Sequence, residues 1–113
     1  MRALVGGMVA GVVLALAWPV FAQPSEPVAH GHAVFQYWCA TCHGAGPGHP
    51  GTDALQSKYH GAKPALLEDR RDLTPDLVRY FVRHGVTIMP FFRKTEVSDA
   101  DLDAIGAYLS RKQ

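Results

Sequence analysis

Apolar positions recur at helical spacing in the stretch LTPDLVRYFVRHG, residues 73–85. Thr74 suits the N-cap, Pro75 the first helical position and Gly85 the C-terminal stop. The apolar stripe between these signals consists of Leu77, Val78, Phe81 and Val82. Because spacings of three and four residues put side chains on one face, the pattern predicts an amphipathic helix, with its two arginines outside the apolar stripe.

The C-terminal stretch SDADLDAIGAYL carries similar signals. Ser98 suits the N-cap, and Asp101, three residues later, is a shorter version of the capping-box partner. Leu102, Ile105 and Leu109 follow at helical spacing and form the expected buried stripe. The stretch therefore predicts the last helix of the chain.

The middle of the chain predicts one further helix, from about His30 to Cys42. Four of its residues fall on one face: Gly31, Phe35, Cys39 and Cys42. The glycines and prolines of GAGPGHPGT, at 44–52, prevent this helix from continuing. A short helix, a turn and an aperiodic loop are expected downstream, at about 53–59, 64–69 and 86–97. Since no strand alternation is visible anywhere, the predicted fold class is all-α.

The first 22 residues carry the pattern of a secretory signal peptide. Arg2 provides a positive start, an unbroken apolar run follows at 3–18, and small residues precede a cleavage site after Ala22. An uncleaved membrane anchor is the alternative, but the apolar run is short for a span. We expect cleavage, a periplasmic location and no membrane anchor in the mature protein. The predicted organisation is a signal peptide at 1–22, a flexible lead-in at 23–29 and one domain at 30–113.

The charge of the mature chain is close to zero, because Arg2 precedes the cleavage site and the whole chain has a formal net charge of +1. No basic block marks a nucleic-acid surface, so no nucleic-acid partner is expected. A chain this short buries a modest core and usually needs disulfides, a metal or a cofactor. Its 2 cysteines do not suffice for a disulfide scaffold.

Both cysteines lie in the motif CATCH, where Cys39, Cys42 and His43 bring two thiols and an imidazole into five positions. A thioredoxin-type disulfide would need a βαβ unit, and structural zinc would need a fourth ligand. A pair of buried free thiols would leave His43 unexplained. The motif is the attachment signature of c-type haem, in which each thiol bonds a vinyl group and the imidazole binds the iron. It predicts one covalent haem c on Cys39 and Cys42, with His43 as an axial ligand.

Met89 is the candidate for the other axial position of the iron. It is the only methionine after the leader, it lies in the loop TIMPFF, and Pro90 keeps it out of helical geometry. His/Met ligation raises the reduction potential and closes the iron to outside ligands. Met89 as core filler is the alternative. Three histidines are rival ligands: His49, His60 and His84.

With these motifs the chain resembles the class I cytochromes c over nearly all of its mature length. GHAVFQYWCATCH is similar to their N-terminal helix, with Gly31 and Phe35 in place, and DLDAIGAYL is similar to their C-terminal helix, with Tyr108 as its aromatic. The resemblance implies a small fold of helices wrapped around one haem, in which these two helices cross closely. A proline carbonyl orients the axial histidine in that family, and Pro47 and Pro50 both qualify here, with Pro50 favoured.

A narrower resemblance rests on the segments GTDAL, KYHGAKPALLEDRRDL and MPFFRKTE. They are similar to the cytochrome subunit of the flavocytochrome p-cresol methylhydroxylase (4-cresol dehydrogenase) and of related alkylphenol and eugenol hydroxylases. This implies a partner flavoprotein of the vanillyl-alcohol oxidase type, which oxidises 4-alkylphenols and passes electrons to the cytochrome. A downstream redox protein would accept them, and the chain itself would be an electron-transfer subunit, not an enzyme. A freely diffusing carrier for another dehydrogenase or oxidase and a haem sensor or ligand-binding domain are the alternatives.

The segment IMPFFRK, from Ile88 to Lys94, is the expected docking surface, because apolar residues are followed at once by two cations. Phe91 and Phe92 are candidate docking contacts, and core packing is equally open for at least one of them. The near-neutral charge argues against a steered, transient encounter and predicts a stable complex.

Overall fold

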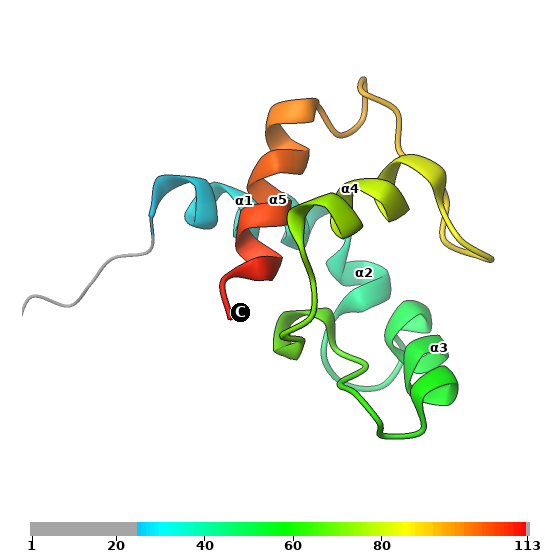
Figure 1. Ribbon diagram of the computed structural model, residues 1–113. Coiled ribbons are helices and arrows are strands. Elements are labelled where there is room, and N and C mark those ends of the chain that lie inside the picture. The colour runs from blue at the N-terminus through cyan, green and yellow to red at the C-terminus, as the bar shows by residue number, and fades with distance from the viewer. Residues whose placement is uncertain (1–24, 113) are drawn as a thin grey trace, which may run out of the picture.

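The computed structural model describes residues 25–112, and within them the chain forms five α-helices and one 3₁₀ turn (Figure 1). In chain order these are α1 (Glu26–Trp38), α2 (Ala40–His43), α3 (Pro50–Tyr59), η1 (Leu67–Asp69), α4 (Pro75–His84) and α5 (Asp99–Ser110). The all-α prediction is confirmed, since the only strand-like feature of this range is an isolated bridge between Val86 and Met89. The expected signal peptide at 1–22 lies outside the described residues. None of the helices in 25–112 has the length and apolar character needed to cross a bilayer.

α1 and α5 cross each other (Figure 1). They meet at Gly31, where the approach is so close that only glycine fits. A Cβ at Gly31 would lie 1.9 Å from the carbonyl oxygen of Ala104 and 2.9 Å from Cβ of Tyr108. Phe35, one turn later, is fully buried, and its ring centre lies 5.7 Å from that of Tyr108. The expected close crossing of the two terminal helices is therefore confirmed.

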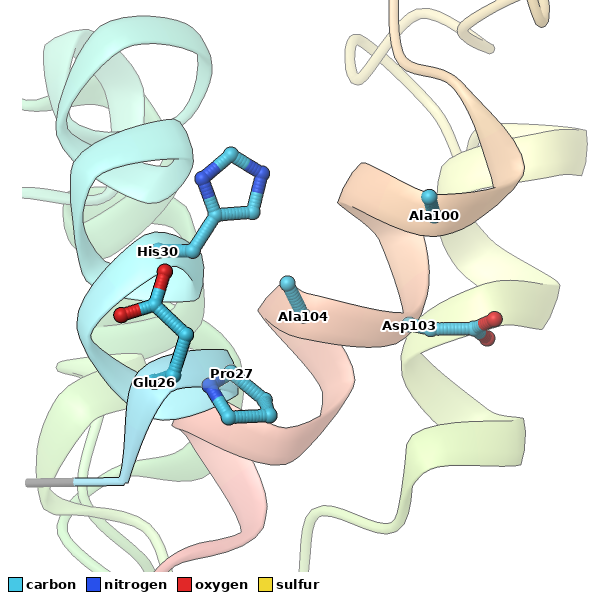
Figure 2. A pocket seen from close by; sticks show the side chains of 6 residues that line it. All are labelled: Glu26, Pro27, His30, Ala100, Asp103 and Ala104. Atoms are coloured by element: carbon cyan, nitrogen blue, oxygen red, sulfur yellow. The ribbon is translucent and has the colours of Figure 1, made fainter.

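A shallow groove lies between the start of α1 and the start of α5 (Figure 2). Its walls are formed by Glu26, Pro27, His30, Ala100, Asp103 and Ala104. His30 extends from α1 toward α5, where its Nε2 lies 2.7 Å from Oδ1 of Asp101. This contact ties the beginnings of the two helices together.

The core lies where α1, α4 and α5 meet. Its buried side chains are Phe35, Leu73, Val78, Val82, Val97, Leu102, Ile105, Tyr108 and Leu109. Full burial of one such side chain stabilises a fold by roughly 1.5–3 kcal/mol. All three residues of the predicted apolar stripe of α5 belong to this core, which confirms the stripe. α4 contributes two residues to the core and directs the other two of its stripe, Leu77 and Phe81, to the cavity described below.

Both predicted N-caps are present. The hydroxyl of Thr74 accepts a hydrogen bond at 3.2 Å from the N–H three residues later, and that of Ser98 accepts one at 3.1 Å in the same way. Each bond satisfies an N–H that has no partner inside its helix. The first turn of α4 also lies close to α5, because a Cβ at Gly106 would come within 3.1 Å of Pro75.

α1 differs from its prediction at both ends. It begins at Glu26 rather than His30, because Pro27 suits a first helical turn, so residues 26–29 are helical and do not belong to a flexible lead-in. It ends at Trp38, and Cys39 (φ −113°) is a one-residue interruption before α2. The two cysteines therefore do not lie on one continuous helix.

α3 is longer than predicted. It begins at Pro50 rather than near Asp53, again with proline in the first turn. This brings Pro50 and Gly51 onto the helix that faces α2, and α2 and α3 lie side by side (Figure 1).

Candidate functional site

A cavity of about 370 Å³ lies between the helices. Cys39, Cys42 and His43 border it from the junction of α1 and α2, and Met89 borders it from the loop after α4. The rest of the wall is mostly apolar and includes the rings of Phe35, Trp38, Tyr59, Phe81 and Phe92. Well-packed interiors lack empty spaces of this size, whereas cofactor pockets have such volumes and linings.

The two thiols have different surroundings. Cys39 packs against the core, and burial, with a smaller effect of Cys42, raises the pKa of its thiol to about 11. Cys42 is exposed, and the two sulfurs are not bonded to each other. A thiol that stays protonated at neutral pH is a poor ligand for a metal ion. In residues 25–112, no three His, Cys, Asp or Glu side chains are arranged to hold a metal ion.

His43 is enclosed by the start of α3. A Cβ at Gly51 would lie 2.7 Å from Cε1 and 2.9 Å from Nδ1 of His43, so only glycine leaves room for the ring. Burial lowers the pKa of His43 and keeps the imidazole neutral, which is the form that binds metals. Its Nδ1 is buried and finds no hydrogen-bond partner in the described part of the chain, so neither Pro47 nor Pro50 bonds it here. Of these two prolines, Pro50 borders the cavity.

Two backbone hydrogen bonds join the ends of the tight turn that carries Met89. The N–H of Val86 donates to the carbonyl of Met89 at 3.0 Å, and the N–H of Met89 donates back at 2.9 Å. Gly85 ends α4 with φ of 70°, as predicted, and a Cβ there would lie 2.6 Å from the carbonyl oxygen of Met89. The backbone thus presents a partly buried Met89 at the cavity.

The three rival histidines lie elsewhere. His84 stacks on Tyr80 at 4.3 Å between ring centres, and its Nδ1 lies 2.7 Å from the carbonyl of the same residue. Nδ1 of His49 lies 3.0 Å from a backbone carbonyl of α2, and His60 is exposed at the end of α3. Within the part of the chain that is described, none of the three borders the cavity, whereas Met89 does.

One stretch of the cavity wall is cationic, which the sequence analysis missed. Arg70 borders the cavity and is only 7% exposed. Its guanidinium donates to both carboxylate oxygens of Asp72 at 2.7 Å and to the hydroxyl of Tyr59 at 3.1 Å, and Lys58 also borders the cavity. An apolar cavity with a cationic stretch fits a flat apolar molecule that carries carboxylates, as a haem does. The only signal in the sequence is the acidic residue two positions after Arg70.

The loop around Met89 also exposes apolar side chains. Ile88 is 74% and Phe91 60% exposed. Phe92 instead borders the cavity, and its ring centre lies 5.9 Å from that of Trp38. Of the two phenylalanines considered for docking, Phe92 is therefore a packing residue and Phe91 is a surface residue.

A comparison with models of known protein families gives a match over residues 26–109, to the family described as cytochrome c oxidase, cbb3-type, subunit III. The matched range covers α1 to α4, all of α5 but its last residue, the CATCH motif and Met89. A search of curated proteins found no match. The chain thus belongs to this family of cytochrome c domains, and it is a class I cytochrome c with a small all-α fold that binds haem c and transfers electrons.

Proposed function

We propose that this protein is an exported electron carrier that holds one haem c covalently in its cavity. The observation that carries the proposal is that a single cavity is bordered by Cys39, Cys42, His43 and Met89. The two cysteines would hold the haem through thioether bonds, and His43 and Met89 would bind the iron. When bound, the haem supplies the one-electron ferric/ferrous couple.

The surroundings of both axial residues support these roles. Partial burial lowers the pKa of His43 and favours its neutral form, and the close approach of Gly51 fixes its ring. Met89 is presented by a loop that two backbone hydrogen bonds close. Because both axial positions would be taken by side chains, no coordination position stays open to a substrate or a gas, which favours a carrier over an enzyme or a sensor.

The remaining wall of the cavity supports the same cofactor. Lys58 supplies positive charge that suits a haem carboxylate, and Arg70, although paired with Asp72, adds N–H donors to the same wall. The apolar side chains around them exclude water, and exclusion of water is one way in which a protein sets a reduction potential.

The proposal is tested by the intact mass of protein purified from the periplasm. We expect a chain that begins at Gln23 and carries one haem, which stays attached in denaturant. We also expect carbon monoxide to bind the reduced Met89→Ala variant but not the reduced wild type. A haem that is released by denaturant contradicts covalent attachment, and carbon monoxide binding by the wild type favours the sensor alternative.

As partner we propose a flavoprotein of the vanillyl-alcohol oxidase type that oxidises 4-alkylphenols, as the narrower resemblance implies, with a further redox protein as acceptor. Ile88 and Phe91 support an apolar docking centre beside Met89. Lys94 is the adjacent cation, and its Nζ already lies 2.7 Å from a carboxylate oxygen of Asp99. The formal net charge of the chain is only +1, which weakens any long-range field and supports a complex with little dependence on salt.

A second candidate partner comes from the description of the family, which names an oxidase subunit. In that role the protein would pass electrons to an oxidase, and a flavoprotein would not be needed. Rapid mixing separates the two roles. A flavoprotein of the vanillyl-alcohol oxidase type, supplied with its phenol, should reduce the haem rapidly in the first role. In the second role, an isolated terminal oxidase should rapidly oxidise the reduced protein.

A further inference from the structure

Arg83, near the end of α4, contacts two other parts of the chain at once. Its Nη1 donates to the carbonyl oxygen of Phe92 at 2.9 Å, and its Nη2 donates to Oδ1 of Asp99 at 2.8 Å. The side chain of Arg83 is 17% exposed and that of Asp99 is 48% exposed, so the bond to Phe92 is better shielded from water than the bond to Asp99. Asp99 also holds Lys94, whose Nζ lies 2.7 Å from its other carboxylate oxygen. One guanidinium therefore joins α4, the loop after it and the start of α5.

The Met89 loop runs from Gly85, directly after α4, to Phe92, and the bond from Arg83 holds its C-terminal end. The N–H of Phe92 donates to the carbonyl of Val82 at 2.8 Å, so both backbone groups of Phe92 are bound to α4. Near the N-terminal end of the loop, Val86 and Met89 exchange their two backbone bonds. Met89 is thus bonded to Val86 within the loop, and the loop is bonded back to α4 at Phe92. Arg83 makes one of the two bonds at Phe92.

Several features of the Met89 loop favour opening. Thr87 has φ of 50°, a conformation that a β-branched residue rarely adopts. Pro90 has no N–H to donate. Ile88 and Phe91 are exposed and bury little apolar surface. Segments with backbone strain and little burial open readily unless other contacts hold them.

We propose that Arg83 is a positioning residue for Met89, because it holds the carbonyl of Phe92 and thereby keeps the methionine at the cavity. Asp99 orients the guanidinium for this task. The inference rests on the proposed function, in which Met89 binds the haem iron. Without Arg83, the sixth coordination position of the iron opens more often.

Arg79 offers a matched control on the same helix. It lies one turn before Arg83, and its ion-pair partners are Asp103 and, at 3.6 Å, Asp99. Within 25–112 its ion pairs reach only α5, so it joins the same two helices without touching the Met89 loop. An effect specific to Arg83 therefore reports on the loop and not on the packing of α4 against α5.

The test measures the binding of imidazole to the ferric holoprotein. At saturating imidazole the binding rate equals the rate at which Met89 leaves the iron. We expect Arg83→Leu to raise this limiting rate by about tenfold to a hundredfold, because a shielded, charge-assisted hydrogen bond is lost. Arg79→Leu should change it by less than about threefold. Denaturant unfolding of both variants shows how much global stability each has lost.

Equal limiting rates for Arg83→Leu and Arg79→Leu overturn the positioning role and leave the proposed function intact. Met89→Ala tests that function separately, since it should bind imidazole without the slow opening step. If Met89→Ala behaves as the wild type does, Met89 is not the ligand and the proposed function fails.

If Arg83→Leu does not accumulate as folded protein, Arg83→Lys tests the same contact. Arg83→Lys retains the charge, but an ammonium group lacks the planar fork that reaches both acceptors. We expect its limiting rate to exceed that of Arg79→Leu by about fivefold or more. Equal rates for these two variants overturn the proposal.

Discussion

Arg70 donates two parallel hydrogen bonds to Asp72, from Nε to Oδ1 and from Nη2 to Oδ2, each 2.7 Å long. The arginine is buried in the cavity wall, whereas the side chain of Asp72 is 45% exposed. Lys63 donates a third hydrogen bond to the same carboxylate at 3.0 Å. Loss of this carboxylate would leave a buried cation beside the cofactor cavity without its counter-ion.

We expect Asp72→Asn to destabilise the holoprotein by roughly 1–2 kcal/mol. Breaking a fully buried ion pair costs about 3–5 kcal/mol, and the exposure of Asp72 lowers that figure because water screens the pair. Asp69→Asn is the control, since Asp69 pairs with Lys112 at the surface and should lose less than about 1 kcal/mol. Denaturant unfolding measures both variants. Equal losses would show that the buried partner, Arg70, makes no difference.

The same pair predicts a pH dependence. The hydrogen bond from Arg70, with a smaller effect of Lys63, holds the pKa of Asp72 well below its usual range. A carboxyl group of this kind stabilises the fold above its unfolded pKa, about 3.9, and the stabilisation is lost as the pH falls below that value. The stability difference between wild type and Asp72→Asn should be full at neutral pH and shrink below about pH 4. An unchanged difference at about pH 2 would count against the pair as its cause.

Gly31→Ala should destabilise the protein by about 3 kcal/mol or more. The added Cβ would overlap the backbone of Ala104, which cannot swing aside as a flexible side chain can, so α1 and α5 would have to separate. Gly46→Ala is the control. A Cβ there meets nothing within 4 Å, and only the φ of 89° opposes alanine, by about 1–2 kcal/mol. If unfolding experiments give Gly31→Ala no larger a loss of stability than Gly46→Ala, the close contact at Gly31 does not limit the packing of α1 against α5.

The parts of the fold that depend on near neighbours in the sequence could be predicted. The N-caps at Thr74 and Ser98, the proline at the start of α4 and the glycine at its end follow rules that act over three or four residues. The CATCH motif is equally local. Residues 39 to 43 indicated a covalently attached haem, and in the structure Cys39, Cys42 and His43 border the same cavity as Met89.

The parts that depend on distant contacts could not be predicted. Arg70 and Arg71 are adjacent and chemically alike, and only the packing of η1 against the cavity buries the first and leaves the second exposed. Phe91 and Phe92 differ for the same reason, because the bonds of Phe92 to α4 turn one ring inward. Nothing in the apolar pattern indicated the interruption at Cys39.

Replacement of both cysteines, Cys39→Ala with Cys42→Ala, should leave a largely unfolded or degraded chain when it is exported. The cavity is large and mostly apolar, and without an attached haem its wall would lose the contacts that fill it. Met89→Ala is the control, because it keeps the covalent haem and should stay folded. Circular dichroism and yield measure the outcome. A compact, helical, haem-free double variant would show that the polypeptide folds without its cofactor.

Phe91→Asp should weaken the complex with the flavoprotein by about tenfold or more and leave the haem spectrum unchanged. Phe91 is exposed beside Met89, and apolar residues near the centre of an interface carry most of its affinity. Phe92→Asp is the matched control, one residue further on. Because Phe92 borders the cavity and packs against Trp38, this variant should change the spectrum and lower the stability.

Gel filtration of the cytochrome co-expressed with the flavoprotein, at low and at high salt, measures the same interaction directly. We expect co-elution at both salt concentrations for the wild type, since the affinity of an apolar centre depends little on salt. Phe91→Asp should elute separately from the flavoprotein under both conditions. If the wild type also elutes separately while the phenol still drives haem reduction, the stable complex is refuted. The protein is then a diffusing carrier that forms only transient complexes with its donor.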